Sequence, residues 1–171
     1  PTFSADSDEA NETTATATNL GTLSGLTTRS NRSIHTTTDV DVYKFTTQAT
    51  GTTAHYVRID FTHSVGDLDI DLLDSSGNVL TSSTGTTDRE EISLSGRTAG
   101  VYYLRVRGYS GARGNYSLSI NAPTPTFSAD SDEANETTAT ATDLRTLSGL
   151  TTRSNRSIHT TTDVDVYKFT T

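Results

Sequence analysis

The sequence of 171 residues contains no cysteine, no methionine and no tryptophan. Without cysteine, the chain can form neither a disulfide framework nor a thiolate metal site. Its 13 lysines and arginines are outnumbered by 21 aspartates and glutamates, which gives a formal net charge of −8 at pH 7. Proteins that bind nucleic acids gather basic residues to contact phosphates. The composition therefore argues against a nucleic-acid partner.

Long apolar runs are also missing. No stretch approaches the ~18 residues that a membrane-spanning helix needs, and no signal-peptide pattern is visible. Catalytic patterns are absent as well: there is no Gly-x-Ser-x-Gly, and the histidines are scattered. We expect a non-catalytic protein without a membrane span, and a mature fragment if the protein is exported.

An internal repeat dominates what is present. Residues 1–47 recur as residues 125–171 with two differences, Asn19 against Asp143 and Gly21 against Arg145. A Pro-Thr joint at 123–124 precedes the second copy, and proline makes such a joint stiff and extended. The repeat predicts one complete domain at 1–122, followed at 125–171 by the N-terminal part of a second. One repeat of roughly 120 residues has the size of a common domain.

Alternating apolar residues predict strands in the middle of the repeat. Residues 55–61, 67–72, 92–94, 102–106 and 116–120 place apolar side chains at every second position. Turns rich in Gly, Ser and Asn separate them, and about a fifth of all residues are threonine, which favours strands over helices. Only residues 10–20 could hold a helical turn or two. The pattern predicts an all-β fold, an antiparallel β-sandwich.

Five motifs of the chain occur in a fixed order: Glu-x-Asn-acid-Thr, Thr-Asp-Val-Asp-Val-Tyr-Lys-Phe, Asp-Leu-Asp-Ile-Asp-Leu-Leu-Asp-x-x-Gly, Ala-Gly-Val-Tyr-Tyr-Leu-Arg-Val and Gly-Asn-Tyr-Ser-Leu. Over nearly all of residues 9–120 this order resembles the bacterial pre-peptidase C-terminal domain, which is related to the collagen-binding domains of collagenases. The resemblance implies a jelly-roll-like sandwich, carried by secreted bacterial proteins, often in tandem. It also implies an extracellular or cell-surface location and an accessory rather than catalytic role.

Oxygen-bearing side chains suggest a calcium site. Four lie within five positions near the start, and two more lie on one face of the strand that begins near residue 40. If the first segment folds back across that strand, all six converge, and calcium takes six to eight oxygen ligands. The resemblance implies Glu9, Asn11 and Glu12 as ligands together with Asp39 or Asp41. Some relatives carry an acid where this chain has Ser7, a place that Asp6 or Asp8 would fill. The candidate ligands in both copies are Asp8, Glu9, Asn11, Glu12, Asp39, Asp41, Asp132, Glu133, Asn135, Glu136, Asp163 and Asp165. The alternative is that these acids cap turns and solubilise an edge.

Two further patterns have plain structural interpretations. Asp67, Asp69 and Asp71 resemble part of an EF-hand loop, but in a strand they stand about 6.6 Å apart, so we interpret them as a solvated sheet face. Exposed tyrosines beside arginines could bind a protein, collagen-like or glycan ligand, although we favour ordinary cross-strand pairing on a solvated sheet as the explanation. The residues of this candidate contact surface are Tyr56, Tyr103, Arg105 and Tyr109.

The repeat and the resemblance lead to two hypotheses of function. In the first, the chain is a structural repeat of an extracellular fibre, stalk or adhesin, stabilised by calcium, whose partners are neighbouring copies joined by strand exchange. In the second, it is an accessory domain of a secreted hydrolase that binds a polymeric matrix. Near-perfect repetition favours the first hypothesis.

Overall fold

The computed structural model describes all residues from 1 to 171 and divides them into two compact units, unit 1 (Pro1–Pro125) and unit 2 (Thr126–Thr171). All regular structure is β-strand except for one short 3₁₀ turn, η1 (Tyr109–Gly111). The helical turns expected within residues 10–20 do not form. Instead, the hydroxyls of Thr13 and Thr16 hold a tight turn, and a strand follows, because threonine side chains compete with helical hydrogen bonds.

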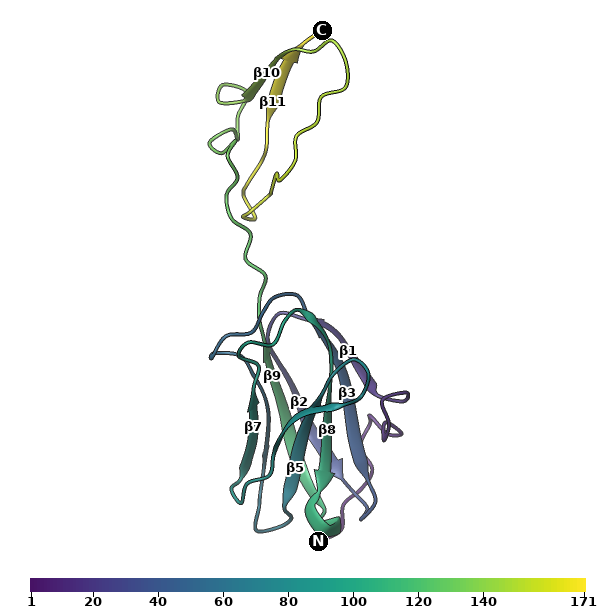
Figure 1. Ribbon diagram of the computed structural model, residues 1–171. Helices are drawn as coiled ribbons and strands as arrows, with labels where there is room; N and C mark the ends of the chain where they lie inside the picture. Colours follow the sequence, from purple (N-terminus) through teal and green to yellow (C-terminus); the bar gives the residue numbers. More distant parts are fainter. The chain divides into compact units, whose positions relative to one another are not determined.

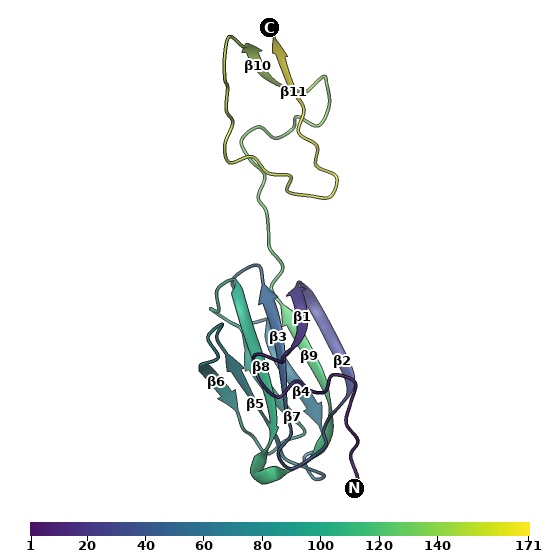
Figure 2. The same ribbon diagram turned by 90° about the vertical axis from the view of Figure 1, so that its right-hand side faces the viewer.

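Unit 1 consists of two sheets packed face to face (Figures 1 and 2). The five-stranded sheet has the order β1 (Thr18–Leu23), β3 (Val40–Thr47), β8 (Gly100–Gly108), β5 (Leu68–Leu73) and β6 (Val79–Ser83). The four-stranded sheet has the order β2 (Gly25–Ile34), β9 (Gly114–Ala122), β4 (Tyr56–Phe61) and β7 (Arg89–Ser93). The predicted all-β sandwich is confirmed.

One strand pair departs from the antiparallel pattern. β1 and β3 run parallel, whereas every other pair in unit 1 is antiparallel. Ser24 alone separates β1 from β2, which belongs to the other sheet. The next residue, Gly25, has φ +70, a conformation that glycine adopts without steric cost and that suits this sharp corner. Because β2 runs back in the opposite layer, β3 re-enters the first sheet in the direction of β1.

The core lies between the two sheets and is made of side chains from both. The interior positions alternate along most strands, as the pattern of apolar residues predicts. Fully buried side chains of this kind contribute roughly 1.5–3 kcal/mol each. The largest apolar ones are Tyr43, Phe45, Ile34, Ile59, Leu68, Ile70, Leu72, Leu94, Leu104, Leu118 and Ile120.

Unit 2 forms a smaller two-stranded sheet from β10 (Thr142–Thr146) and β11 (Tyr167–Thr170). These strands pair in parallel, and Thr142 lies opposite Tyr167 just as Thr18 lies opposite Tyr43 in unit 1. Residues 149–158, which repeat the sequence of β2, contain no strand.

Candidate functional site: an acidic cluster at the start of β3

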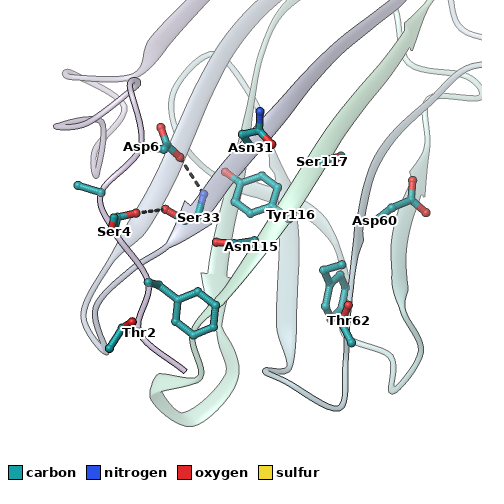
Figure 3. A pocket seen from close by; sticks show the side chains of 13 residues that line it. Thr2, Ser4, Asp6, Asn31, Ser33, Asp60, Thr62, Asn115, Tyr116 and Ser117 are labelled. Atoms are coloured by element: carbon teal, nitrogen blue, oxygen red, sulfur yellow. Dashed lines mark hydrogen bonds between the residues drawn. The ribbon is translucent and has the colours of Figure 1, made fainter.

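The N-terminal segment folds back over the first residues of β3 and the last residues of β2. The backbone N–H of Val42 donates to the carbonyl of Asn11 at 2.9 Å. At β2, the backbone N–H of Ser33 donates to Asp6 Oδ2 at 2.8 Å, and the Ser33 hydroxyl donates to the carbonyl of Ser4 at 2.7 Å (Figure 3). These hydrogen bonds hold the acidic N-terminal segment against β2 and β3. The sequence predicts that this segment folds back across the strand that begins near residue 40.

The convergence produces an acidic cluster, which we define as Asp6, Glu9, Asn11, Asp39 and Asp41. One carboxylate oxygen from each of Asp6, Glu9 and Asp41 lies within 4.8 Å of the others. Glu9 and Asp39 form a second group of the same size with a ring nitrogen of His35. The cluster thus combines oxygens from the N-terminal segment with oxygens from the start of β3.

Several oxygens of the cluster are buried without a hydrogen-bond partner. Asn11 and Asp41 are 0 % exposed and Asp39 is 6 % exposed, and the Oδ1 atom of each accepts no hydrogen bond. Leaving a buried polar oxygen unpaired costs about 1–3 kcal/mol, and more when it carries charge. Buried carboxylates are normally paired or coordinate a metal. A set made of carboxylate and amide oxygens without sulfur fits a hard cation such as calcium.

Burial also changes the acidity of the cluster. Burial, together with the negative charges of Asp39, Asp6 and Glu9, raises the pKa of Asp41 to about 7. A hydrogen bond of 2.5 Å from the Tyr116 hydroxyl to Asp41 Oδ2 opposes this effect. Burial likewise raises the pKa of Glu9, with a further contribution from the charge of Asp39. A bound cation would favour the ionised forms of both carboxyls.

His35 is a member of this site that the sequence pattern did not identify. Its Nδ1 atom lies 2.6 Å from Asp39 Oδ2 and 3.0 Å from Glu9 Oε1. Partial burial lowers the pKa of the imidazole, but the hydrogen bond and charge of Asp39, together with Glu9, outweigh it, so the pKa is raised. The spacing of four residues between His35 and Asp39 is the only signal for this contact in the sequence.

Two of the expected ligands lie outside the cluster. Asp8 pairs with arginines, since its carboxylate is 2.9 Å from Arg32 Nη1 and 3.7 Å from Arg29 Nη1. Glu12 is exposed to solvent. Asp6 lies beside Glu9 and Asp41. Some relatives carry an acid at the position of Ser7, and in this chain Asp6, not Asp8, supplies that acid to the cluster.

Unit 2 reproduces much of this arrangement. Glu133, His159 and Asp163 gather as Glu9, His35 and Asp39 do. The Oδ1 atoms of Asn135, Asp163 and Asp165 are again buried and accept no hydrogen bond. Asp132 pairs with Arg153 and Arg156, and Glu136 is exposed, so both follow their counterparts in unit 1.

The interpretation of Asp69 and Asp71 as part of a solvated sheet face is wrong, because each is only 2 % exposed. The strand register places Arg107 opposite Asp69 and Arg105 opposite Asp71, and the pairs are 2.9 Å apart. Burial alone would raise the pKa of Asp71, but hydrogen bonds from Ser82 and Arg105 lower it below the ordinary value. These carboxylates therefore pair with arginines and are shielded from solvent.

The candidate contact surface does not form one patch. Tyr56 lies on β4 in the four-stranded sheet, where the Arg58 guanidinium lies 4.1 Å from its ring centre. Tyr103 and Arg105 lie on β8 in the other sheet. Tyr109, in η1, is 59 % exposed. The outer faces of the two sheets point in opposite directions, so Tyr56 does not share a face with Tyr103 and Arg105.

A polar groove of about 620 Å³ lies next to the acidic cluster. One wall is the N-terminal segment with Phe3 and Asp6, and the other is formed by β2, β4 and β9 (Figure 3). Asp6 contributes to both the groove and the cluster. The position of the wall therefore depends on how the cluster holds the N-terminal segment.

Comparisons with known proteins found one family and several solved structures that are similar to the chain. Residues 39–108 match the family described as the bacterial pre-peptidase C-terminal domain. The solved structure of the pre-peptidase C-terminal domain of a Bacillus anthracis collagenase is 22% identical and covers 60% of this chain and 91% of that one, with a TM-score of 0.44. PliG of Aeromonas hydrophila, a periplasmic inhibitor of g-type lysozyme, is 12% identical and covers 61% of this chain and 96% of that one, with a TM-score of 0.40. No curated protein matches. The chain contains no helix with the length and apolar character needed to span a membrane.

Proposed function

We propose that the chain is a non-catalytic extracellular module whose N-terminal segment is fixed to the sandwich by calcium. The observation that carries the proposal is the set of buried, unpaired oxygens of Asn11, Asp39 and Asp41. A divalent cation would satisfy these oxygens and neutralise carboxylates that now face one another. The family match at residues 39–108 supports an accessory rather than catalytic role, because pre-peptidase C-terminal domains are accessory domains.

Within this proposal, the module acts as a structural repeat of a fibre, stalk or adhesin. Residues 1–47 and 125–171 differ at only two positions, and arrays of nearly identical repeats reuse one interface many times. Calcium at the start of β3 would stiffen the connection between the N-terminal segment and the sandwich. Neighbouring copies are the partners in such an array.

The second candidate is a matrix-binding accessory domain. The groove beside Phe3 supports it, since it is open, polar and bounded by Asn115 and Ser117 on β9. A groove of this kind suits an extended polymeric ligand with many hydroxyl or amide groups. In this case calcium would set the position of the groove wall rather than join repeats.

Thermal unfolding of the full chain tests the calcium proposal. Circular dichroism would be followed in millimolar calcium and again after chelation. At free calcium 100 times the dissociation constant, the native state gains about 2.7 kcal/mol, and the melting temperature rises accordingly. The Asp41→Asn variant should lose this rise. Glu12→Gln is the matched control, because Glu12 belongs to the same acidic motif but is exposed, and it should keep the rise. Equal melting temperatures of the unmodified chain in both buffers would contradict the proposal.

A further inference from the structure

A pocket of about 430 Å³ lies in unit 1 where β5 begins and β8 ends. The residues that line this pocket, which we call the corner pocket, are Asp67, Asp69, residues 84–86, Arg107 and Tyr109. None of them belongs to the acidic cluster or lines the polar groove beside the N-terminal segment. Pockets of about 300–1,000 Å³ are typical of small-molecule sites. The corner pocket is therefore large enough for a ligand of its own.

Hydrogen bonds fix two walls of the corner pocket. The backbone N–H of Tyr109 donates to the carbonyl of Asp67 at 2.9 Å, which joins η1 to the start of β5. On the opposite side, the buried carboxylate of Glu90 accepts hydrogen bonds from the backbone of Gly85 at 2.7 Å and from the Ser83 hydroxyl. A Cβ atom at Gly85 would lie 2.8 Å from Glu90 Oε1, so this close approach favours glycine. The pocket is thus formed before a ligand binds, which lowers the entropy cost of binding.

Buried carboxylates hold Arg107 at the edge of the pocket. Asp69 and Asp71 are each 2 % exposed, and they lie 2.9 and 3.2 Å from the Arg107 guanidinium. Asp69 Oδ2 is nevertheless buried without a hydrogen bond. Burial raises the pKa of Asp69, and the charge of Arg107 offsets this only in part. Buried ion pairs seldom stabilise a fold more than apolar side chains would. The structural effect of these carboxylates is to fix the position of one arginine.

Three kinds of accessible group meet in the corner pocket. The partly exposed carboxylate of Asp67 can only accept hydrogen bonds when it is ionised. Arg107 is also partly exposed, and its ion pairs use only part of its five N–H donors. Tyr109 is 59 % exposed, so its ring offers an apolar face to a ligand. The exposed hydroxyls of Thr84 and Thr86 both donate and accept.

This combination of groups selects among classes of ligand. An ammonium group only donates hydrogen bonds, so it would leave Arg107 unused and lie close to its positive charge. A phosphate only accepts and would face the carboxylate of Asp67. A peptide group donates and accepts in opposite directions, and β5 and β8 are interior strands without an open edge to which a peptide strand could be added. Neighbouring hydroxyls of a sugar donate and accept on one side of the ring, and a pyranose presents C–H groups on its face.

We propose that the corner pocket is a saccharide-binding site. Asp67 accepts hydrogen bonds from sugar hydroxyls, and Arg107 donates to a neighbouring sugar oxygen. The ring of Tyr109 packs against the C–H face of the sugar. The proposal goes beyond the calcium function and does not rest on it, because no residue of the pocket is among the proposed calcium ligands.

Titration of the full chain with sugars, followed by NMR of the backbone amides, tests the proposal. The probes are the methyl glycosides of glucose, galactose, mannose and N-acetylglucosamine. Because the pocket makes few polar contacts, we expect a dissociation constant on the order of 1–10 mM for the sugar that fits. At least one glycoside should shift the amide signals of residues 67–69, 84–86 and 107–109 in a saturable way.

Substitutions at accessible residues show whether the pocket itself binds the sugar. Tyr109→Ala should weaken binding by about tenfold, because truncating an aromatic contact residue commonly has an effect of this size. The fold should be unchanged, since Tyr109 is exposed. Asp67→Ala should also weaken binding, because it removes the acceptor. Tyr103→Ala is the matched control: Tyr103 lies on β8 but does not line the pocket, so this variant should bind as the unmodified chain does.

Three results would overturn the proposal. The first is the absence of shifts with all of the glycosides up to about 100 mM, ten times the weakest binding expected. The second is a set of shifts outside the pocket, or shifts that Tyr109→Ala leaves unaltered. The third is binding of N-acetyl-lysine N-methylamide at the same amides while no sugar binds, because this probe carries an ammonium group and two peptide groups. The melting experiment in calcium and chelator contains no sugar, so the calcium proposal and the saccharide proposal can fail separately.

Discussion

The chain contains two copies of one sequence, in unit 1 and in unit 2. Comparing them separates the contacts that form within this segment from the contacts that depend on residues outside it. In unit 1, residues 1–47 contribute three strands, whereas in unit 2 the same sequence forms only two. The strand that is missing corresponds to β2, whose partner in unit 1 is β9. The hydrogen bonds that hold β2 as a strand therefore come from residues outside the repeated segment.

Contacts made within the segment persist in both units. Asp130 accepts a hydrogen bond from the backbone of Ser157 at 2.8 Å, as Asp6 does from Ser33. His159 lies 2.8 Å from Asp163, as His35 lies beside Asp39. The group of Glu9, His35 and Asp39 thus forms from contacts within 47 residues, because Glu133, His159 and Asp163 gather in the same way in unit 2. The group of Asp6, Glu9 and Asp41 is found in unit 1 alone.

The largest expected effect comes from matched core substitutions in the two copies. Ile34→Ala should lower the free energy of unfolding of unit 1 by about 2–5 kcal/mol, because Ile34 is 1 % exposed. Ile158→Ala, at a position that is 56 % exposed, should change it by less than about 0.5 kcal/mol. Urea unfolding would measure both. Equal effects would show that the two copies are buried alike in solution.

The next effect concerns the carboxyl group of Asp41, which is buried in unit 1, whereas its counterpart Asp165 in unit 2 is only partly buried. The pKa of Asp41 is about 7 in the folded chain and about 3.9 when unfolded, so the folded state holds one more proton between these values. After chelation, the free energy of unfolding should therefore fall by about 1.4 kcal/mol per pH unit as the pH rises across that window, relative to Asp41→Asn. Calcium should reverse the loss near pH 7, because it favours the ionised carboxylate. Parallel pH profiles of the two proteins in chelator would contradict this account.

Most of the sandwich was predictable from the sequence because its strands alternate apolar and polar residues. The parallel pairing of β1 was not, since it depends on a change of sheet at Ser24 that leaves no periodic signal. The segment that bears the acidic site was predictable from its oxygens, but the exclusion of Asp8 was not. Its pairing with Arg32, 24 residues away in sequence, depends on how the segment crosses β2. The prediction that Asp69 and Asp71 are solvated was wrong for a similar reason. Their arginine partners lie on β8, and only the strand register shows that these residues are opposite each other.

A smaller effect is expected when the Tyr116 hydroxyl, which has no counterpart in unit 2, is removed from unit 1. Tyr116→Phe removes the hydrogen bonds to Asp41 and to Tyr43 but keeps the ring in the core. In chelator, the free energy of unfolding should fall by about 1–3 kcal/mol, because a buried carboxylate loses its hydrogen-bond donor. Chemical denaturation with and without calcium would measure it. Ser117→Ala, at the exposed neighbouring position on β9, is the control and should have little effect.

The smallest effect concerns one of the two positions at which the copies differ. Gly21 has φ +77, and Arg145 occupies the same place with φ 64. In both copies the backbone N–H of this residue donates to the side chain two positions earlier, Asn19 at 2.9 Å or Asp143 at 2.8 Å, so the turn is the same. A Cβ atom at Gly21 would meet nothing within 4 Å, which leaves the left-handed conformation as the only penalty. Gly21→Arg should therefore destabilise unit 1 by about 1–2 kcal/mol in a melting experiment. Gly21→Ala is the matched control and should cost the same, because the penalty arises from the Cβ atom; a much larger loss with arginine alone would mean that the side chain, not the backbone, distinguishes the two copies.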